Sequence, residues 1–120
     1  MSPNLIRESL SKILESQYIL SSPYDLDRYS CDALTPSRAF YAEDAFKRLA
    51  DLVVQPGSTA EICKILHWAQ TSKITVIPYG GGTGVMGSTL PVNGGIILDL
   101  ARLNKIIEIN QLDMTIAVES

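Results

Sequence analysis

The fold is decided by a glycine-rich stretch, PYGGGTGVMG at residues 78–87, which directly follows an apolar run. The stretch holds five of the eight glycines in this 120-residue chain. Glycines cluster in this way where the backbone must adopt positive φ or lie very close to a bound group. Successive free N–H groups in such a loop form a concave site that suits an anion. The stretch therefore predicts a phosphate-binding loop, and the alternative is an irregular connection between strands.

Two familiar nucleotide-binding motifs fit this loop only in part. Residues 82–87 match the G-x-G-x-x-G pattern, but in that motif the glycine turn opens a helix that faces the pyrophosphate. Here Pro91 and the Asn-Gly-Gly at 93–95 would interrupt such a helix within two turns. The outer glycines also have P-loop spacing, but Ser88 stands where that motif requires lysine. The sequence therefore disfavours both the dinucleotide-binding motif and the P-loop. A nicotinamide-binding site in this loop would need a helix beginning near Gly84.

Composition places the chain among globular domains. It has 46% hydrophobic and 19% charged residues, and 120 residues suffice for one domain with its own core. The net charge of −3 gives no electrostatic reason to expect a nucleic-acid partner. Cys31 and Cys63 lack metal-ligand spacing, which indicates two ordinary thiols in a reducing compartment and no metal site. Early charges and the lack of a long apolar run argue against a signal peptide or transmembrane segment, so we expect a cytoplasmic protein.

The first fifty residues predict one helix and a long extended segment. Ser2 and Pro3 are typical of a helix start, and the apolar residues that follow fall on one face to about Tyr18. Residues 21–42 show neither a helical nor a strand period, which is long for a structureless connection. We expect a short helix over residues 43–52 to close this segment.

Residues 53–78 predict a β-α-β unit. Short apolar runs at 52–56 and 74–78, each ending in proline, are typical of buried strands. Between them, Ser58 and Glu61 form an S-x-x-E capping box ahead of apolar residues at helical spacing. Strands joined by such a helix run parallel, so the glycine loop would follow the carboxyl end of the second strand. Open α/β sheets bind their ligands at that edge.

Beyond the loop, strands follow one another with no helix between them. Apolar runs occur at 96–100, 106–109 and 115–118, and the five residues at 110–114 are short enough for a hairpin. We therefore expect an antiparallel sheet after the loop and an α+β fold. The last apolar strand runs into the C-terminus, which indicates a chain that stops inside a domain. It also predicts an exposed strand edge near Val118 through which copies of the chain would associate.

Taken together, these segments resemble the FAD-binding domain of the vanillyl-alcohol oxidase and p-cresol methylhydroxylase (PCMH) type. The resemblance is carried by VVQPGSTAEI at 53–62, TVIPYGGGTGVMGSTLP at 75–91 and GGIILDLARLNKIIEI at 94–109. Within that superfamily the chain is most similar to the glycolate oxidase FAD-binding subunit and the D-lactate dehydrogenases. It divides into an N-terminal helix with an extended segment at 1–50 and the N-terminal part of the FAD-binding domain at 51–120.

The resemblance implies that backbone N–H groups of the loop bind the FAD pyrophosphate. It assigns cofactor-binding roles to Pro56, Pro78, Tyr79, Gly80, Gly81, Gly82, Thr83, Gly84, Gly87 and Ser88. The family often has arginine where this chain has Tyr79, so phosphate binding would rest more on backbone dipoles. Members with covalently attached FAD usually have a histidine in this loop, where Thr83 stands. The one histidine, His67, lies on the predicted helix instead, which implies non-covalent FAD.

The resemblance also implies an activity: an FAD-dependent oxidoreductase that takes a hydride from a 2-hydroxy acid such as glycolate or D-lactate. The electrons would then pass to an acceptor, which could be a partner subunit. The chain is short for that family, because a further FAD-binding segment and a substrate domain are missing. We assign no catalytic residue, since Asp99 and Glu108 read as ordinary strand carboxylates. The alternative is a stand-alone binding or interaction module, or a gene remnant, without catalysis.

Overall fold

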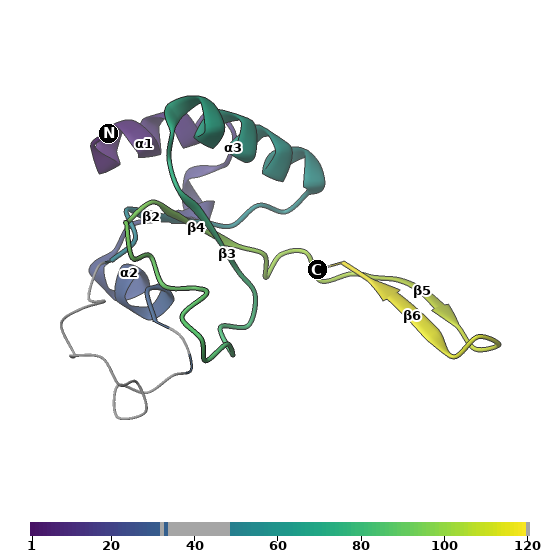
Figure 1. Ribbon diagram of the computed structural model, residues 1–120. Helices are drawn as coiled ribbons and strands as arrows, with labels where there is room; N and C mark the ends of the chain where they lie inside the picture. The colour runs from purple at the N-terminus through teal and green to yellow at the C-terminus, as the bar shows by residue number, and fades with distance from the viewer. Residues whose placement is uncertain (32, 34–48, 120) are drawn as a thin grey trace.

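The computed structural model describes residues 1–31, 33 and 49–119, and Figure 1 shows how its helices and strands are arranged. In chain order the elements are α1 (Pro3–Leu10), the 3₁₀ helix η1 (Ser16–Tyr18), β1 (Ile19–Leu20), α2 (Pro23–Tyr29), β2 (Leu52–Val54), α3 (Thr59–Ser72), β3 (Val76–Tyr79), β4 (Ile96–Asp99), β5 (Ile106–Asn110) and β6 (Thr115–Val118). None of the helices within the described residues is both long and apolar enough to cross a membrane.

Four strands form one mixed sheet in the order β1-β2-β4-β3. β2 and β3 both run parallel to β4, whereas β1 runs antiparallel to β2. The predicted parallel strands on either side of a helix are confirmed, but β4 lies between them. The expectation that residues 96–100 begin the antiparallel sheet is therefore wrong. All four residues of β4 are buried, as a central strand covered on both faces requires.

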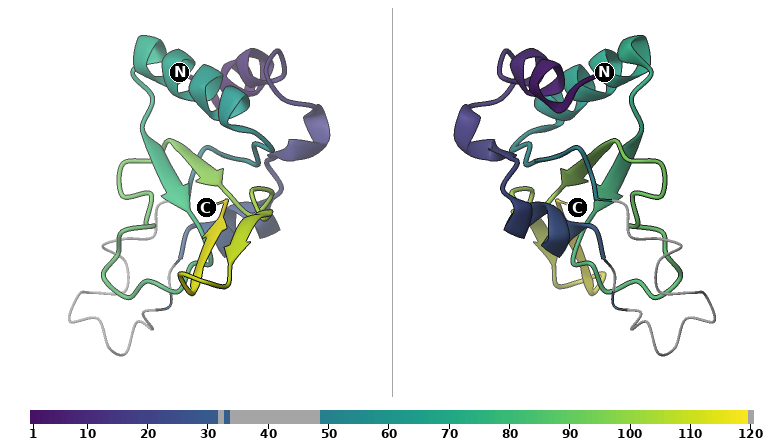
Figure 2. Two further views of the ribbon diagram at one scale, coloured as in Figure 1. Left: turned by 90° about the vertical axis from the view of Figure 1, so that its right-hand side faces the viewer. Right: turned by 90° about the vertical axis from the view of Figure 1, so that its left-hand side faces the viewer.

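Helices cover both faces of this sheet. Figures 1 and 2 show α1 and α3 over one face and α2 against the other. Alternate residues of the strands point to the two layers. Leu52, Val54, Ile96 and Leu98 join the core under α1 and α3, with Ile6, Leu10, Leu14, Ile19 and Ile65. Val53, Ile77 and Ile97 form the second core with Tyr29 and Ala50. Each fully buried Leu or Ile contributes about 2 kcal/mol by removing apolar surface from water.

The predicted helix over α3 is confirmed together with its cap. The Ser58 hydroxyl accepts a hydrogen bond from the Glu61 N–H at 3.2 Å. The Glu61 carboxylate in turn accepts from the Gly57 N–H at 2.7 Å. The first bond is the N-cap itself, whereas the second reaches the residue before the N-cap instead of the Ser58 N–H that a standard capping box would bind.

The N-terminal region differs from the sequence prediction. α1 ends at Leu10 instead of continuing to Tyr18, because Glu15 is extended and the chain turns into η1 and β1. Residues 21–42 were expected to have no regular structure, yet α2 occupies 23–29. The Ser22 hydroxyl caps α2 by accepting from the Asp25 N–H at 3.1 Å. The short helix expected over 43–52 falls largely outside the described residues, and its last residue begins β2.

β5 and β6 form the predicted antiparallel hairpin, which projects away from the mixed sheet (Figure 1). The register pairs Ile106 with Val118 and Ile109 with Ile116, with an irregularity between Ile106 and Glu108. This bulge places the four paired apolar side chains on one face of the hairpin. Each of the four is more than half exposed, so within the described part of the chain the face is uncovered.

Candidate functional site

The glycine loop leaves the sheet at the end of β3, where the three parallel strands have their carboxyl ends. β2 is followed there by Gln55, β4 ends at Asp99 and β3 ends at Tyr79. The Leu100 N–H donates to the Tyr79 carbonyl at 3.0 Å and fixes the start of the loop to the neighbouring strand end. The loop therefore lies at the sheet edge where open α/β sheets bind ligands.

The loop that follows β3 contains no helix. Residues 80–95 are turns and coil, which excludes the helix near Gly84 that a nicotinamide-binding motif would need. Gly82 has φ +66° and Gly87 has φ +78°, which both favour glycine. A Cβ at Gly82 would also collide with the Tyr79 hydroxyl, so this position requires glycine for two independent reasons.

Gly80 and Gly81 are different, because no contact with a described residue requires glycine there. Neither residue has positive φ. Among the described residues, a Cβ at Gly80 would meet nothing within 4 Å, and one at Gly81 would meet only the Thr83 methyl at 3.7 Å. Two adjacent exposed positions thus lack a side chain although no described neighbour prevents one. Glycine at both positions would allow a ligand to approach the backbone closely.

Five consecutive residues at the start of the loop have backbone N–H groups without a partner in the described part of the chain. Within the described residues, the N–H groups of the five consecutive residues 80–84 donate no hydrogen bond. Free backbone N–H groups at this density are the donors that an anionic group such as a phosphate needs. The donor set and the bare positions fit a pyrophosphate.

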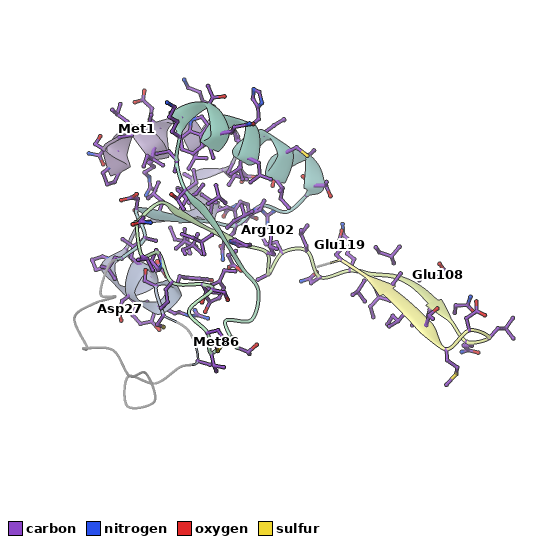
Figure 3. All side chains as sticks on the ribbon, viewed as in Figure 1. Met1, Asp27, Met86, Arg102, Glu108 and Glu119 are labelled. Carbon is purple, nitrogen blue, oxygen red and sulfur yellow. The ribbon has the colours of Figure 1, made fainter. Side chains whose placement is uncertain are left out.

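The remaining predicted site residues occupy different places around the loop. Thr83, Gly84 and Ser88 are exposed on it, as is Pro78 just before it, whereas Tyr79 and Gly87 are partly buried. Met86 lies at the end of the loop that is farthest from the sheet (Figure 3), and its side chain is 87% exposed. Pro56 is fully buried after β2 and is separated from β3 by β4. The structure thus brings residues 78–88 together, with Pro56 at a neighbouring strand end.

A buried polar cluster beside the loop was missed by sequence reasoning. Asp99 is 1% exposed, and its carboxylate accepts from the Tyr29 hydroxyl at 2.7 Å. The Gln55 side-chain amide donates to the same oxygen at 2.7 Å, and the Ala101 N–H donates to the other oxygen at 3.0 Å. Burial, together with the hydrogen bond to Asp99 and its negative charge, raises the pKa of Tyr29 to about 12. Tyr29 is therefore a neutral donor throughout the physiological range.

The segment after α2 also reaches the loop. The Ala33 N–H donates to the Gly84 carbonyl at 2.9 Å. Burial and then the nearby thiol of Cys31 raise the pKa of Tyr79. Ala33 thus lies beside the loop, although it follows α2 and is far from the loop in sequence.

Comparison with known proteins gives a family match. A profile of the family described as "FAD binding domain" matches residues 50–120. D-2-hydroxyglutarate dehydrogenase of Xanthomonas citri pv. viticola is 30% identical over 115 residues, which cover 93% of this chain and 22% of that protein. Glycolate oxidase subunit GlcD of Bacillus subtilis is 30% identical over 111 residues, which cover 92% of this chain and 23% of that protein.

A third relative is mitochondrial D-lactate dehydrogenase (cytochrome) of Arabidopsis thaliana, which is 32% identical over 117 residues. The match covers 98% of this chain and 19% of that protein. The chain thus spans about a fifth of the length of the curated relatives it matches.

Solved structures share the fold. Alkyldihydroxyacetonephosphate synthase superposes with a TM-score of 0.80 at 22% identity, covering 98% of this chain and 24% of that chain. p-Cresol methylhydroxylase with substrate bound superposes with a TM-score of 0.71 at 20% identity, covering 89% of this chain and 20% of that chain. At these identities the likeness concerns the fold alone.

Proposed function

Because the chain belongs to the FAD-binding domain family, whose profile matches residues 50–120, we propose that its glycine loop holds the pyrophosphate of FAD. The resemblance inferred from sequence and FAD as the cofactor are confirmed by the family match and the relatives. The α+β fold of the PCMH type is confirmed by the solved structures. The observation that supports the loop assignment is the adjacent pair Gly80 and Gly81, bare although the fold does not require glycine there.

The residues divide into donors and flanking groups. The N–H groups of residues 80–84 donate to phosphate oxygens, and the exposed Thr83 hydroxyl is a further donor. Pro78, Tyr79, Gly87 and Ser88 flank the phosphates, while Pro56 shapes the neighbouring strand end. FAD is held without a covalent bond, since the loop contains no histidine.

The activity we propose for the whole protein is oxidation of a 2-hydroxy acid. The names of three relatives support it, because they specify D-2-hydroxyglutarate dehydrogenase, glycolate oxidase and D-lactate dehydrogenase. Bound FAD supplies the redox chemistry, and this chain's residues bind and orient its phosphates. The word "subunit" in the glycolate oxidase name supports a partner subunit, and we propose that such a partner accepts the electrons. The cytoplasmic location and the division into 1–50 and 51–120 remain proposals that rest on the sequence.

We also propose that copies of the chain associate through the free edge of the hairpin near Val118. β6 pairs only with β5 among the described strands, and Val118 is 53% exposed. An unpaired strand edge with exposed apolar side chains favours pairing with another chain.

The alternative function is a stand-alone binding module without catalysis. Bleaching of the flavin absorbance by a panel of 2-hydroxy acids, in the FAD-loaded protein, would decide for the enzyme.

The loop assignment is tested by titrating the 120-residue chain with FAD and following flavin fluorescence. Among the described residues, the Cβ of Gly80→Val would meet nothing within 4 Å and that of Gly81→Val would make only an ordinary contact with Thr83, so thermal unfolding should change little while FAD affinity falls tenfold or more. Ala117→Val, at an exposed hairpin position, is the matched control and should bind like the wild type. Valine variants that bind FAD as tightly as the wild type would show that this loop is not the phosphate site.

A further inference from the structure

We propose that Tyr29 is a positioning residue for the glycine loop, linking the buried Asp99 carboxylate to the Tyr79 ring against which Gly82 packs. The consequence for FAD rests on the function proposed above, but the effect on the loop does not. Neither Tyr29 nor Asp99 belongs to the loop, and neither is expected to touch the phosphates.

The first step is the anchoring of Asp99. Its carboxylate is 1% exposed and accepts from three segments: Tyr29 on α2 at 2.7 Å, Gln55 after β2 at 2.7 Å and Ala101 after β4 at 3.0 Å. A buried carboxylate is tolerated only when such donors satisfy it. The Tyr29 hydroxyl is therefore held at the carboxyl end of the central strand by a partner that cannot easily move.

The second step leads from Tyr29 to the loop. The Tyr29 and Tyr79 rings meet edge to face, with centroids 4.9 Å apart and an interplanar angle of 64°. This is a favoured geometry for aromatic pairs. The Tyr79 hydroxyl in turn occupies the space that a side chain at Gly82 would need. The loop thus folds over the Tyr79 ring, whose position depends on the Tyr29 ring.

A second connection runs along the chain. Ala33, four residues after Tyr29, donates its N–H to the Gly84 carbonyl at 2.9 Å. The loop is therefore tied to the end of α2 at two points, through the Tyr79 ring at Gly82 and through the backbone at Gly84. Both depend on where α2 ends, which the Tyr29 to Asp99 hydrogen bond fixes.

The simpler interpretation is that Tyr29 only fills the core under the sheet, with Val53, Ile77 and Ile97. The two interpretations differ in what the hydroxyl does. Phenylalanine keeps the ring and its core packing but removes the donor to Asp99. Under the simpler interpretation, Tyr29→Phe lowers the stability of the whole fold. Under ours, it increases the backbone motion of residues 80–84 more than that of the rest of the chain.

The test is NMR relaxation of the 120-residue chain without FAD, comparing Tyr29→Phe with Tyr24→Phe on the same helix, where the tyrosine is 75% exposed. We expect Tyr29→Phe to lower the amide order parameters of residues 80–84 toward about 0.6, while α3 stays near about 0.85. Tyr24→Phe should match the wild type. Asp99→Asn, which weakens the same hydrogen bond, should loosen the same residues and serves if Tyr29→Phe does not fold.

Unchanged order in residues 80–84, or an equal loss in α3 and in the loop, would overturn the proposal. FAD titration of the same variants separates the two proposals. A looser loop with roughly tenfold weaker FAD binding supports both. A looser loop in a chain whose FAD affinity is unchanged by Gly80→Val and Gly81→Val supports the positioning role and counts against the loop as the phosphate site. A looser loop with unchanged FAD affinity would support the positioning of the loop by Tyr29 but overturn its role in cofactor binding.

Discussion

The guanidinium of Arg102 lies 3.5 Å from the centroid of the Tyr18 ring and joins two distant parts of the chain. It also donates to the Gln55 carbonyl at 2.8 Å and lies 3.9 Å from the Glu61 carboxylate. Figure 3 shows Arg102 where the chain leaves the mixed sheet for the hairpin. One side chain therefore connects η1, the turn after β2, the start of α3 and the hairpin linker.

Replacing Arg102 should destabilise the fold. Arg102→Ala should lower the free energy of unfolding by about 1–3 kcal/mol, because it removes a cation–π contact and leaves the Gln55 carbonyl without this donor. Arg102→Lys should restore only part of this loss, because an ammonium lacks the planar fork of donors. Urea denaturation measures both, with Lys105→Ala as the exposed control at about 0.5 kcal/mol or less. An Arg102→Ala loss as small as the control would show that the cluster is not held by Arg102.

The glycines of the loop should respond differently to alanine. Gly82→Ala should cost about 1–3 kcal/mol of stability, because φ is +66° and the new Cβ would collide with Tyr79. Gly80→Ala should leave stability within about 0.5 kcal/mol, because its Cβ would enter open space. Thermal unfolding of the two FAD-free variants checks this contrast. Equal losses would mean that the loop conformation described above is wrong.

High pH should weaken the contribution of Tyr29 to stability. Its pKa is raised from the ordinary 10.0 to about 12, so below pH 10 the hydroxyl is protonated whether the chain is folded or not. Above pH 10 the unfolded tyrosine ionises first, which stabilises the unfolded state. The stability advantage of the wild type over Tyr29→Phe should therefore shrink by about 1.4 kcal/mol between pH 9 and pH 11. Urea denaturation at both pH values measures it, and an advantage that is constant or grows would contradict this sign.

The exposed apolar face of the hairpin should govern self-association. Ile109→Thr and Ile116→Thr keep β-branched side chains on β5 and β6 but remove apolar surface, so association should weaken. Stability should change little, because both positions are more than half exposed. Sedimentation velocity across a concentration series measures the effect, with Ala117→Thr on the opposite face as the control. A strictly monomeric wild type would contradict the proposed association.

Local signals predicted the elements that carry the loop. The capping signal at Ser58 and the apolar runs of β2 and β3 each lie within a few residues, and the helix and strands they predict match the structure. The glycine density predicts a phosphate-binding loop, which stays a prediction. α2 carried such a signal too. Ser22 and Pro23 repeat the Ser-Pro start of α1, but the aspartates and tyrosines that follow concealed the helical period.

Other features could not be found from local pattern. Tyr29 and Asp99 are separated by 70 residues, and nothing near either one indicates the other. The position of β4 is a similar case, because a uniformly apolar run indicates burial on both faces but not which strands lie beside it. The different roles of the loop glycines are a third case, because the contacts that require glycine at Gly82 but not at Gly80 or Gly81 exist only in the folded chain.

The insertion of β4 between β2 and β3 has a consequence for the order in which the chain folds. β2, α3 and β3 are complete by residue 79, but their strands do not touch each other and cannot close a sheet. Before residues 96–99 join the sheet, β2 and β3 have no strand between them to pair with. Tyr29, which we propose positions the glycine loop, also lacks its hydrogen-bond partner Asp99 until then. Sheet closure and loop ordering should therefore occur in one late step, slowed by the entropy of closing long chain segments. On the ribosome, the nascent chain would remain open until nearly all of the first hundred residues had been made.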